Sequence, residues 1–250
     1  MTSLAWIDDL SPFPHPSKAL AEGLLAVGGD LSIARLTLAY SQGIFPWFNE
    51  GDPILWWCPD PRMVLFCDEL RVSRSLSKRL RQLARDDDNP RAPVQIRLNT
   101  AFTQVIRACA EPREPQAGTW ISPQIRSAYH AWHKAGHVHS VETWINGELM
   151  GGLYGVSIGR FFFAESMFAR SSDASKLALV YLVRFLKQQG ICQIDCQQQT
   201  AHLASLGARP IARDDFLSLL AEARRHPTAQ WPAGRLLSTG QLAPLPTMTP

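Results

Sequence analysis

The sequence lacks the signals of a disulfide-stabilised, membrane-spanning or nucleoside-triphosphate-binding protein. Its five cysteines are an odd number and include no C-x-x-C pair, so we expect neither a disulfide framework nor a common zinc site. The longest apolar run, from Leu177 to Leu186, is interrupted by Arg184 and is far too short to cross a bilayer. The sequence also contains no G-x-x-x-x-G-K phosphate loop and no internal repeat.

The bulk composition is that of an ordinary globular protein. The chain has 250 residues, of which 46% are apolar and 19% charged, which suits one large domain or a medium domain with a small companion. The net charge of +3 is too small by itself to predict a nucleic-acid partner. The first ten residues include Asp8 and Asp9 and lack a signal-peptide layout, so we expect a cytoplasmic protein with no membrane partner.

Turn signals and periodicity divide the chain into a small N-terminal domain (1–62), a larger domain (63–235) and a Pro-rich C-terminal tail (236–250). From about residue 226 the periodicity is lost, and we expect this part to lie along the surface or to fray. The larger domain alternates between predicted strands (63–67, 94–98, 138–145, 149–156, 161–168 and 191–197) and predicted helices (73–85, 101–110, 122–134 and 174–189). Strands that first meander and then cross over through a helix predict an α/β (α+β) fold, with a mixed, mostly antiparallel sheet flanked by helices.

Two of the predicted buried strands carry acids where an apolar residue would cost less. They are Glu165 and Asp195, and a buried carboxylate is costly unless it is paired or hydrogen-bonded. Because side chains alternate along a strand, we expect Asp195 to share a face with Gln197, and Glu165 to share one with Phe161 and Met167. An Asp–Gln unit can orient a nucleophile. The alternatives are satisfied polar groups at a strand end for that unit, and a buried salt bridge to an arginine for Glu165.

The helix predicted over residues 73–85 carries a basic stripe. Arg74, Lys78, Arg81 and Arg85 fall on one side with helical periodicity, and leucines fall on the other. Such a stripe suits a phosphate backbone, although a merely solvated helix face is the alternative.

Tryptophans gather in predicted loops. Loop tryptophans such as Trp47 and Trp120 can stack on nucleobases. For Trp56 and Trp57 we favour a role in packing the two domains together.

Other chemistries are disfavoured by spacing. The histidines between His130 and His139 have no carboxylate or cysteine partners at a usual metal-site spacing, so no metal is expected. The glycines around Gly151 follow a strand but precede no helix, which excludes a dinucleotide fingerprint. Cys196 is expected to face away from Asp195 and has no positioned histidine, so it is not expected to be a nucleophile.

Many short segments, in order, resemble the leucyl/phenylalanyl-tRNA–protein transferase family. Among them are Gly43-Ile-Phe-Pro-Trp47, Trp56-Trp-Cys-Pro-Asp-Pro-Arg62, Glu165-Ser-Met-Phe168, Asp173-Ala-Ser-Lys176 and Ile194-Asp-Cys-Gln197. The resemblance extends from about residue 12 to about residue 235.

The resemblance implies a fold, an activity and partners. The larger domain would be similar to the GNAT acetyltransferase fold. The family moves leucine or phenylalanine, and less readily methionine, from Leu-tRNA or Phe-tRNA to the α-amino group of proteins that begin with Arg or Lys. The product enters N-degron proteolysis. The family acts largely as a monomer in the cytoplasm and needs no metal or nucleotide cofactor.

The resemblance also implies roles for individual residues. Asp195 and Gln197 match the catalytic pair, and Glu165 matches an acid that supports the site and helps to receive the basic N-terminus. Trp47 and Trp120 match aromatic residues near the 3′ adenosine. The positions that match the apolar pocket for the transferred side chain are Leu153, Leu179, Leu182, Leu186 and Ile194.

Elementary chemistry agrees with this activity. Aminolysis of an aminoacyl ester is downhill and needs no ATP, and an α-amino group with a pKa of about 8 needs only a modest base. We hypothesise that Gln197, held by Asp195, positions the amine while Asp195 supports its developing positive charge.

Two other functions remain as alternatives. An acetyl-CoA-dependent N-acetyltransferase would need a glycine-rich pyrophosphate loop before a helix, and the segment Asp173-Ala-Ser-Lys176 has none. A non-catalytic tRNA-binding protein would leave Glu165, Asp195 and Gln197 without a role.

Overall fold

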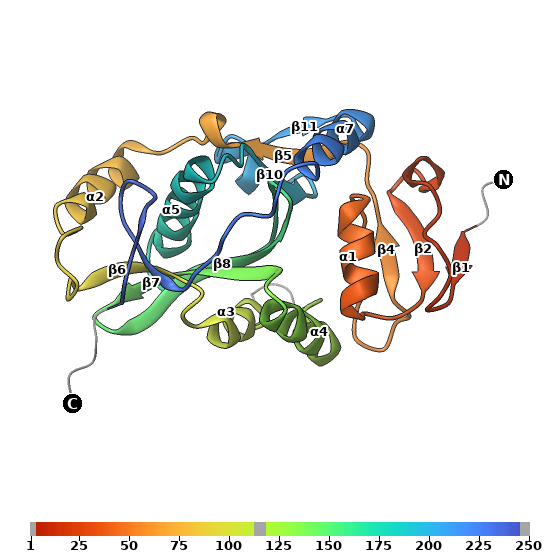
Figure 1. Cartoon of the computed structure of the whole chain (residues 1–250), viewed down its shortest axis with the longest axis horizontal. Helices are drawn as coiled ribbons and strands as arrows, with labels where there is room; N and C mark the ends of the chain where they lie inside the picture. The colour runs from red at the N-terminus through yellow and green to blue at the C-terminus, as the bar shows by residue number, and fades with distance from the viewer. Residues whose placement is uncertain (1–3, 113–118, 246–250) are drawn as a thin grey trace.

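The computed structural model describes residues 4–112 and 119–245, which form two β-sheets with helices packed on them (Figure 1). The N-terminal sheet has the strand order β1-β2-β4-β3. Its elements are β1 (Ala5–Ile7), the short helix η1 (Pro16–Lys18), β2 (Leu24–Gly28), α1 (Ile33–Ser41), β3 (Phe45–Pro46) and β4 (Leu55–Trp57). Helix α1 begins where the Ser32 side chain accepts a hydrogen bond from the Arg35 N–H, which is a common N-cap arrangement.

The larger sheet has nine strands in the order β11-β5-β10-β9-β8-β7-β6-β12-β13. Its strands are β5 (Arg62–Phe66), β6 (Val94–Leu98), β7 (Val138–Ile145), β8 (Glu148–Ile158), β9 (Phe161–Ala169), β10 (Gln193–Gln197), β11 (Arg209–Ile211), β12 (Gly234–Leu236) and β13 (Leu242–Ala243). Its helices are η2 (Cys67–Glu69), α2 (Arg74–Ala84), α3 (Phe102–Cys109), α4 (Pro123–Lys134), α5 (Ala174–Gln188), α6 (Ala201–Ser205) and α7 (Arg213–Ala223).

The sheet is mixed and mostly antiparallel, as predicted. Strands β7, β8 and β9 form an antiparallel meander, and α5 then crosses over so that β10 pairs parallel to β9. The β7–β8 turn consists of Asn146 and Gly147, both at positive φ (52° and 83°), with Ile145 opposite Glu148. That is the two-residue hairpin expected for an Asn-Gly pair.

Two apolar clusters cover the two faces of the large sheet. The first cluster joins α3, α4 and α7 to the N-terminal sheet and includes Tyr40, Trp56 and Phe161. The second cluster contains residues of α2 and α5, and these two helices lie on the opposite side of the sheet from α3 and α4 (Figure 1). Because the first cluster contains buried side chains from both sheets, including Trp56, the two parts of the chain pack on each other. A domain boundary at residue 62 stays our proposal.

The C-terminal region differs from the surface segment that we expected. Strand β12 pairs with β6, and β13 pairs with β12, so residues 234–243 extend the edge of the large sheet. Trp231 stacks on His139 with ring centroids 4.2 Å apart. Strands of three and two residues are too short to show a hydrophobic alternation, so the sequence pattern did not predict them. Within residues 4–112 and 119–245, no helix has the length and apolar character to cross a membrane.

Candidate active site

Neighbouring strands β9 and β10 are both irregular at the level of the predicted site. Against β8, Ala164 pairs with Gly155 and Ser166 with Tyr154, so Glu165 is an extra residue. Against β5, Asp195 pairs with Val64 and Gln197 with Met63, so Cys196 is an extra residue. Such β-bulges redirect side chains and are common beside active sites.

The bulge in β9 corrects one prediction. Glu165 lies on the face of Phe161, as expected, but Met167 packs against the second apolar cluster on the other face. The extra residue reverses the alternation of side chains beyond Glu165. A strand pattern that assumes strict alternation therefore assigns Met167 to the wrong face.

Glu165 accepts hydrogen bonds from neutral donors. The Tyr40 hydroxyl lies 2.7 Å and the Gln197 Nε2 3.1 Å from its Oε1, and the Tyr129 hydroxyl lies 3.4 Å from its Oε2. The two tyrosine hydroxyls are 2.5 Å apart. The described residues provide no arginine or lysine partner for Glu165, so the alternative of a buried salt bridge is wrong for this residue.

These surroundings alter the acidity of the group. Burial raises the pKa of Glu165 to about 7, a rise that the Tyr40 hydrogen bond opposes and the charge of Asp195 reinforces. Burial and the nearby Glu165 raise the pKa values of Tyr40 and Tyr129 well above their ordinary value, so both hydroxyls stay protonated. A carboxyl group that titrates near neutral pH is suited to general acid–base work.

Asp195 forms the buried salt bridge instead. Its Oδ1 lies 2.8 Å from Arg62 Nε and its Oδ2 2.7 Å from Arg62 Nη2, and both side chains are 0% exposed. The same Oδ1 accepts the Gln197 backbone N–H at 2.8 Å. Asp195 is therefore connected to Gln197 through the main chain of Gln197 and not through its carboxamide, which is bound to Glu165.

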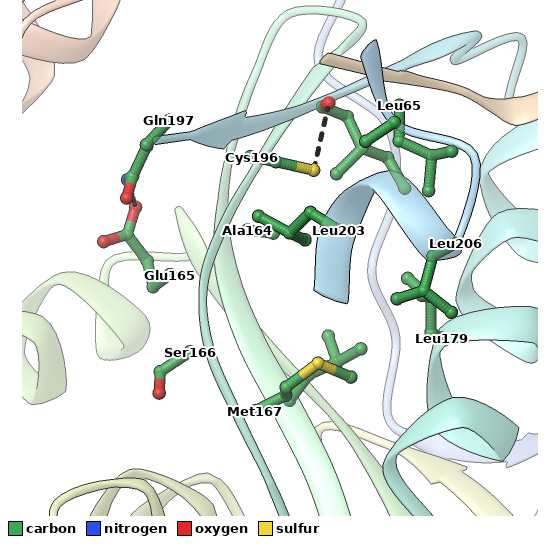
Figure 2. A pocket seen from close by; sticks show the side chains of 13 residues that line it. Leu65, Ala164, Glu165, Ser166, Met167, Leu179, Cys196, Gln197, Leu203 and Leu206 are labelled. Atoms are coloured by element: carbon green, nitrogen blue, oxygen red, sulfur yellow. Dashed lines mark hydrogen bonds between the residues drawn. The ribbon is translucent and has the colours of Figure 1, made fainter. Parts of the chain in front are cut away.

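An apolar pocket of about 130 Å³ opens beside this polar group (Figure 2). In Figure 2, Glu165 and Gln197 point toward each other on one side, while the apolar side chains gather on the other. The lining residues are Leu65, Leu153, Ala164, Glu165, Ser166, Met167, Leu179, Ile194, Cys196, Gln197, Leu203, Leu206 and Ala208.

The pocket includes only some of the predicted apolar residues. Leu153, Leu179 and Ile194 line it. Leu182 and Leu186 are fully buried in the second cluster and do not line it. The pattern missed the wall made by α6 and the residues after it, because a helix of five residues is too short to show an amphipathic period. Its only signal was the segment His202-Leu-Ala-Ser-Leu-Gly-Ala208.

The predicted nucleic-acid contacts lie apart from the pocket lining. Arg74, Lys78 and Arg81 are exposed on α2, and Arg85 is exposed at its C-cap. Leu76 and Leu80 of α2 are buried in the second cluster.

The two candidate tryptophans are accessible to different degrees. Trp47 is 39% exposed and meets Trp57 edge-on at 5.6 Å. Trp120 is half-buried against the first cluster. Neither tryptophan lines the pocket.

The histidines that could suggest a metal site pack against aromatic rings. His133 stacks on Phe102 at 4.2 Å and His139 on Trp231 at the same distance. Among the residues that the structure describes, no group of three His, Cys, Asp or Glu side chains is placed to hold a metal. The Cys196 thiol lines the apolar pocket, and burial raises its pKa, which disfavours the thiolate that a nucleophile requires.

The chain was compared with known proteins. Residues 64–221 match the family described as leucyl/phenylalanyl-tRNA protein transferase, and residues 29–60 match the N-terminal domain of that family. A leucyl/phenylalanyl-tRNA–protein transferase from Bordetella bronchiseptica is 57% identical over 245 residues, covering 97% of this chain and 96% of the relative. One from Bordetella petrii is 56% identical and covers 98% of each chain.

A more distant likeness is to a solved GCN5-related N-acetyltransferase from Kribbella flavida. It is 11% identical, with a TM-score of 0.32 over 70% of this chain and 59% of that chain. The family matches and the full-length relatives agree with each other. The chain belongs to the leucyl/phenylalanyl-tRNA protein transferase family of aminoacyltransferases.

Proposed function

We propose that this protein transfers leucine or phenylalanine, and less readily methionine, from its tRNA to the N-terminal α-amino group of proteins that begin with Arg or Lys. The observation that carries the proposal is an apolar pocket of about 130 Å³ directly beside Glu165 and Gln197. Apolar cavities of about 150 Å³ accept a benzene ring, so the pocket suits the side chain of leucine or phenylalanine. If the side chain of a bound aminoacyl group fills the pocket, its ester would lie beside Glu165 and Gln197.

The chemistry requires one bond to form and one to break. The α-amino nitrogen attacks the ester carbonyl carbon, an amide bond forms, and the bond to the 3′ oxygen of the tRNA breaks. A proton leaves the amine, and the departing oxygen takes one up. Glu165, with a pKa of about 7, is close in acidity to an α-amine of pKa about 8 and can relay that proton. The Gln197 carboxamide, held by Glu165, positions the amine.

The acceptor and the tRNA carry opposite charges, and each is matched by its proposed site. A protein that begins with Arg or Lys brings cations to Glu165, whose anionic form attracts them. The acceptor stem brings phosphates, which suit the exposed stripe of Arg74, Lys78, Arg81 and Arg85. Trp47 is accessible for stacking on the 3′ adenosine, and we assign Trp120 to the same end of the tRNA.

We further propose that the reaction occurs in the cytoplasm, that the protein acts as a monomer, and that the product is a substrate for N-degron proteolysis. A leucine or phenylalanine added to a basic N-terminus changes which side chain the first residue presents, and proteolytic recognition of N-termini depends on that side chain.

The proposal is tested by incubating the protein with radiolabelled Leu-tRNA and a peptide that begins with Arg. We expect label in a peptide longer by one leucine. A peptide with an acetylated N-terminus and one that begins with Gly are the matched controls and should stay unlabelled. Acetylation of the Arg peptide by acetyl-CoA, with no transfer from tRNA, would favour an acetyltransferase instead. Binding of Leu-tRNA without any product would favour a non-catalytic tRNA-binding protein.

A further inference from the structure

The ion pair of Arg62 and Asp195 joins four separate elements. Arg62 begins β5 and Asp195 lies in β10. The Arg62 guanidinium lies between two rings, 4.7 Å from the centroid of Phe45 in β3 and 4.5 Å from that of Phe216 in α7. The N-terminal sheet, two neighbouring strands of the large sheet and helix α7 therefore meet at one guanidinium group.

Both carboxylate oxygens of Asp195 accept hydrogen bonds. Oδ1 accepts from Arg62 Nε and from the Gln197 N–H, and Oδ2 accepts from Arg62 Nη2. The side chain is 0% exposed and does not line the apolar pocket. All three hydrogen bonds to this carboxylate come from the protein itself, and Arg62 pairs with its negative charge.

The bond from Asp195 to the Gln197 backbone has a structural consequence. Gln197 adopts a positive φ of 61°, which is unfavourable for a residue other than glycine and persists only where the surroundings enforce it. The bulge at Cys196 precedes it. The result is that the Gln197 carboxamide reaches Glu165 at 3.1 Å.

We propose that Arg62 and Asp195 are positioning residues that hold the backbone of Gln197 in its left-handed conformation, so that its carboxamide meets Glu165 and the incoming amine. This inference rests on the proposed function, and it assigns Arg62 a part in the reaction. It also replaces the hypothesis that the Asp195 charge directly supports the amine. Asp195 acts through Gln197, and Arg62 acts through Asp195.

The test is a double-mutant cycle on kcat for transfer of leucine to an Arg peptide. Asp195→Asn keeps an acceptor for the Gln197 N–H but weakens the ion pair. The double variant Arg62→Met/Asp195→Leu removes the pair without leaving an unpaired buried charge, a replacement that proteins often tolerate. Arg62 Nη1 has no hydrogen-bond partner among the described residues, so its removal leaves no broken bond at that atom. Each change is made in the wild type and in a Gln197→Ala background, and kcat and KM are measured from steady-state rates.

We expect the apolar double variant to lower kcat about a hundredfold, the scale of a displacement of about 1 Å in an active site. Asp195→Asn should retain more activity, because its amide oxygen still accepts the Gln197 N–H. The KM for Leu-tRNA should stay within about twofold of the wild-type value. In the Gln197→Ala background neither change should lower kcat further.

Three results would overturn the positioning role. They are equal losses of kcat in both backgrounds, wild-type kcat in the apolar double variant, and a rise in KM that accounts for the whole loss. Thermal unfolding of each variant identifies any that fail to fold. If the apolar double variant fails to fold, the comparison of Asp195→Asn in the two backgrounds decides the test. Absence of transfer by the wild-type protein rejects the proposed function and is distinct from all three results.

Discussion

Leu179→Ala should change which amino acid is transferred most readily. Leu179 lines the apolar pocket and is 6% exposed, so its truncation enlarges the pocket by the volume of three carbon atoms. The side chain of phenylalanine has three more carbons than that of leucine. In the wild type the pocket of about 130 Å³ is slightly smaller than the cavities of about 150 Å³ that accept benzene.

The size of the effect follows from the burial of those carbons. Each buried CH₂ contributes about 0.8 kcal/mol, so three contribute at most about 2.4 kcal/mol. Aromatic carbons carry fewer hydrogens and the enlarged pocket will relax partly, so we expect about 1–2 kcal/mol in favour of phenylalanine. The ratio of kcat/KM for Phe-tRNA to that for Leu-tRNA should therefore rise roughly 5–30-fold.

The matched control is Leu182→Ala. Leu182 is on the same helix and is fully buried in the same apolar cluster, but it does not line the pocket. Both variants should lose stability, by about 2–5 kcal/mol, and only Leu179→Ala should change the ratio. Both donors are compared in one reaction with a single Arg peptide. Equal ratios in the two variants would show that the transferred side chain does not enter this pocket.

Three further predictions concern the charge, the acid and the C-terminal region. Replacing Arg74 and Arg81 with Gln should reduce the slope of log Kd for Leu-tRNA against log salt concentration by roughly one to two. An unchanged slope would show that the stripe is only a solvated helix face. Activity should rise with pH as Glu165 ionises near 7, and Glu165→Gln should abolish that limb. Because the folded protein keeps this proton above the ordinary pKa of 4.5, the contribution of Glu165 to stability declines between about pH 4.5 and 7, and Glu165→Gln should flatten Tm across that window. Trp231→Ala should destabilise the fold by about 3 kcal/mol in urea titrations while kcat stays unchanged, since the half-buried ring packs on His139 away from the pocket.

The pH prediction depends on every group that faces Glu165. Tyr40 of α1 and Tyr129 of α4 donate to it, Tyr154 of β8 is close enough for the charge of Glu165 to raise its pKa, and Asp195 of β10 raises the pKa of Glu165 itself. The tyrosines stay protonated near neutral pH because their pKa values are raised well above 10. Glu165 is therefore the group in this cluster whose charge changes near pH 7.

Sequence patterns predicted the elements with strong local signals. Strand β6 and the Asn146-Gly147 hairpin were predicted at the residues where they lie, because alternation and a turn that requires positive φ are local properties. Acids in predicted buried strands directed attention to Glu165 and Asp195, and strand alternation added Gln197. The resemblance to a family then implied their roles, and the structure brings the three residues together.

Local patterns could not predict the contacts that depend on the fold. The partner of Asp195 is Arg62, 133 residues away in the chain, and no periodicity connects the two. Tyr40 and Tyr129 reach Glu165 from two different helices, α1 and α4, and both have the ordinary appearance of core aromatics in the sequence. The bulges at Glu165 and Cys196 break the alternation of side chains. That alternation was the basis for predicting which face of the sheet each strand residue occupies.

Under the proposed function, those two bulges would let one pair of strands serve two substrates. Without them, Glu165 and Met167 would lie on the same face of β9. With them, the acid faces Tyr40 and the thioether side chain lines the apolar pocket on the other face. Strands β9 and β10 pair only at Phe162 with Ile194 and at Phe163 with Asp195, and the pocket opens beyond that point. Under the proposed function, an aminoacyl side chain in the pocket on the α5 face would therefore place its ester beside Glu165 and Gln197, beyond the point where the two strands pair.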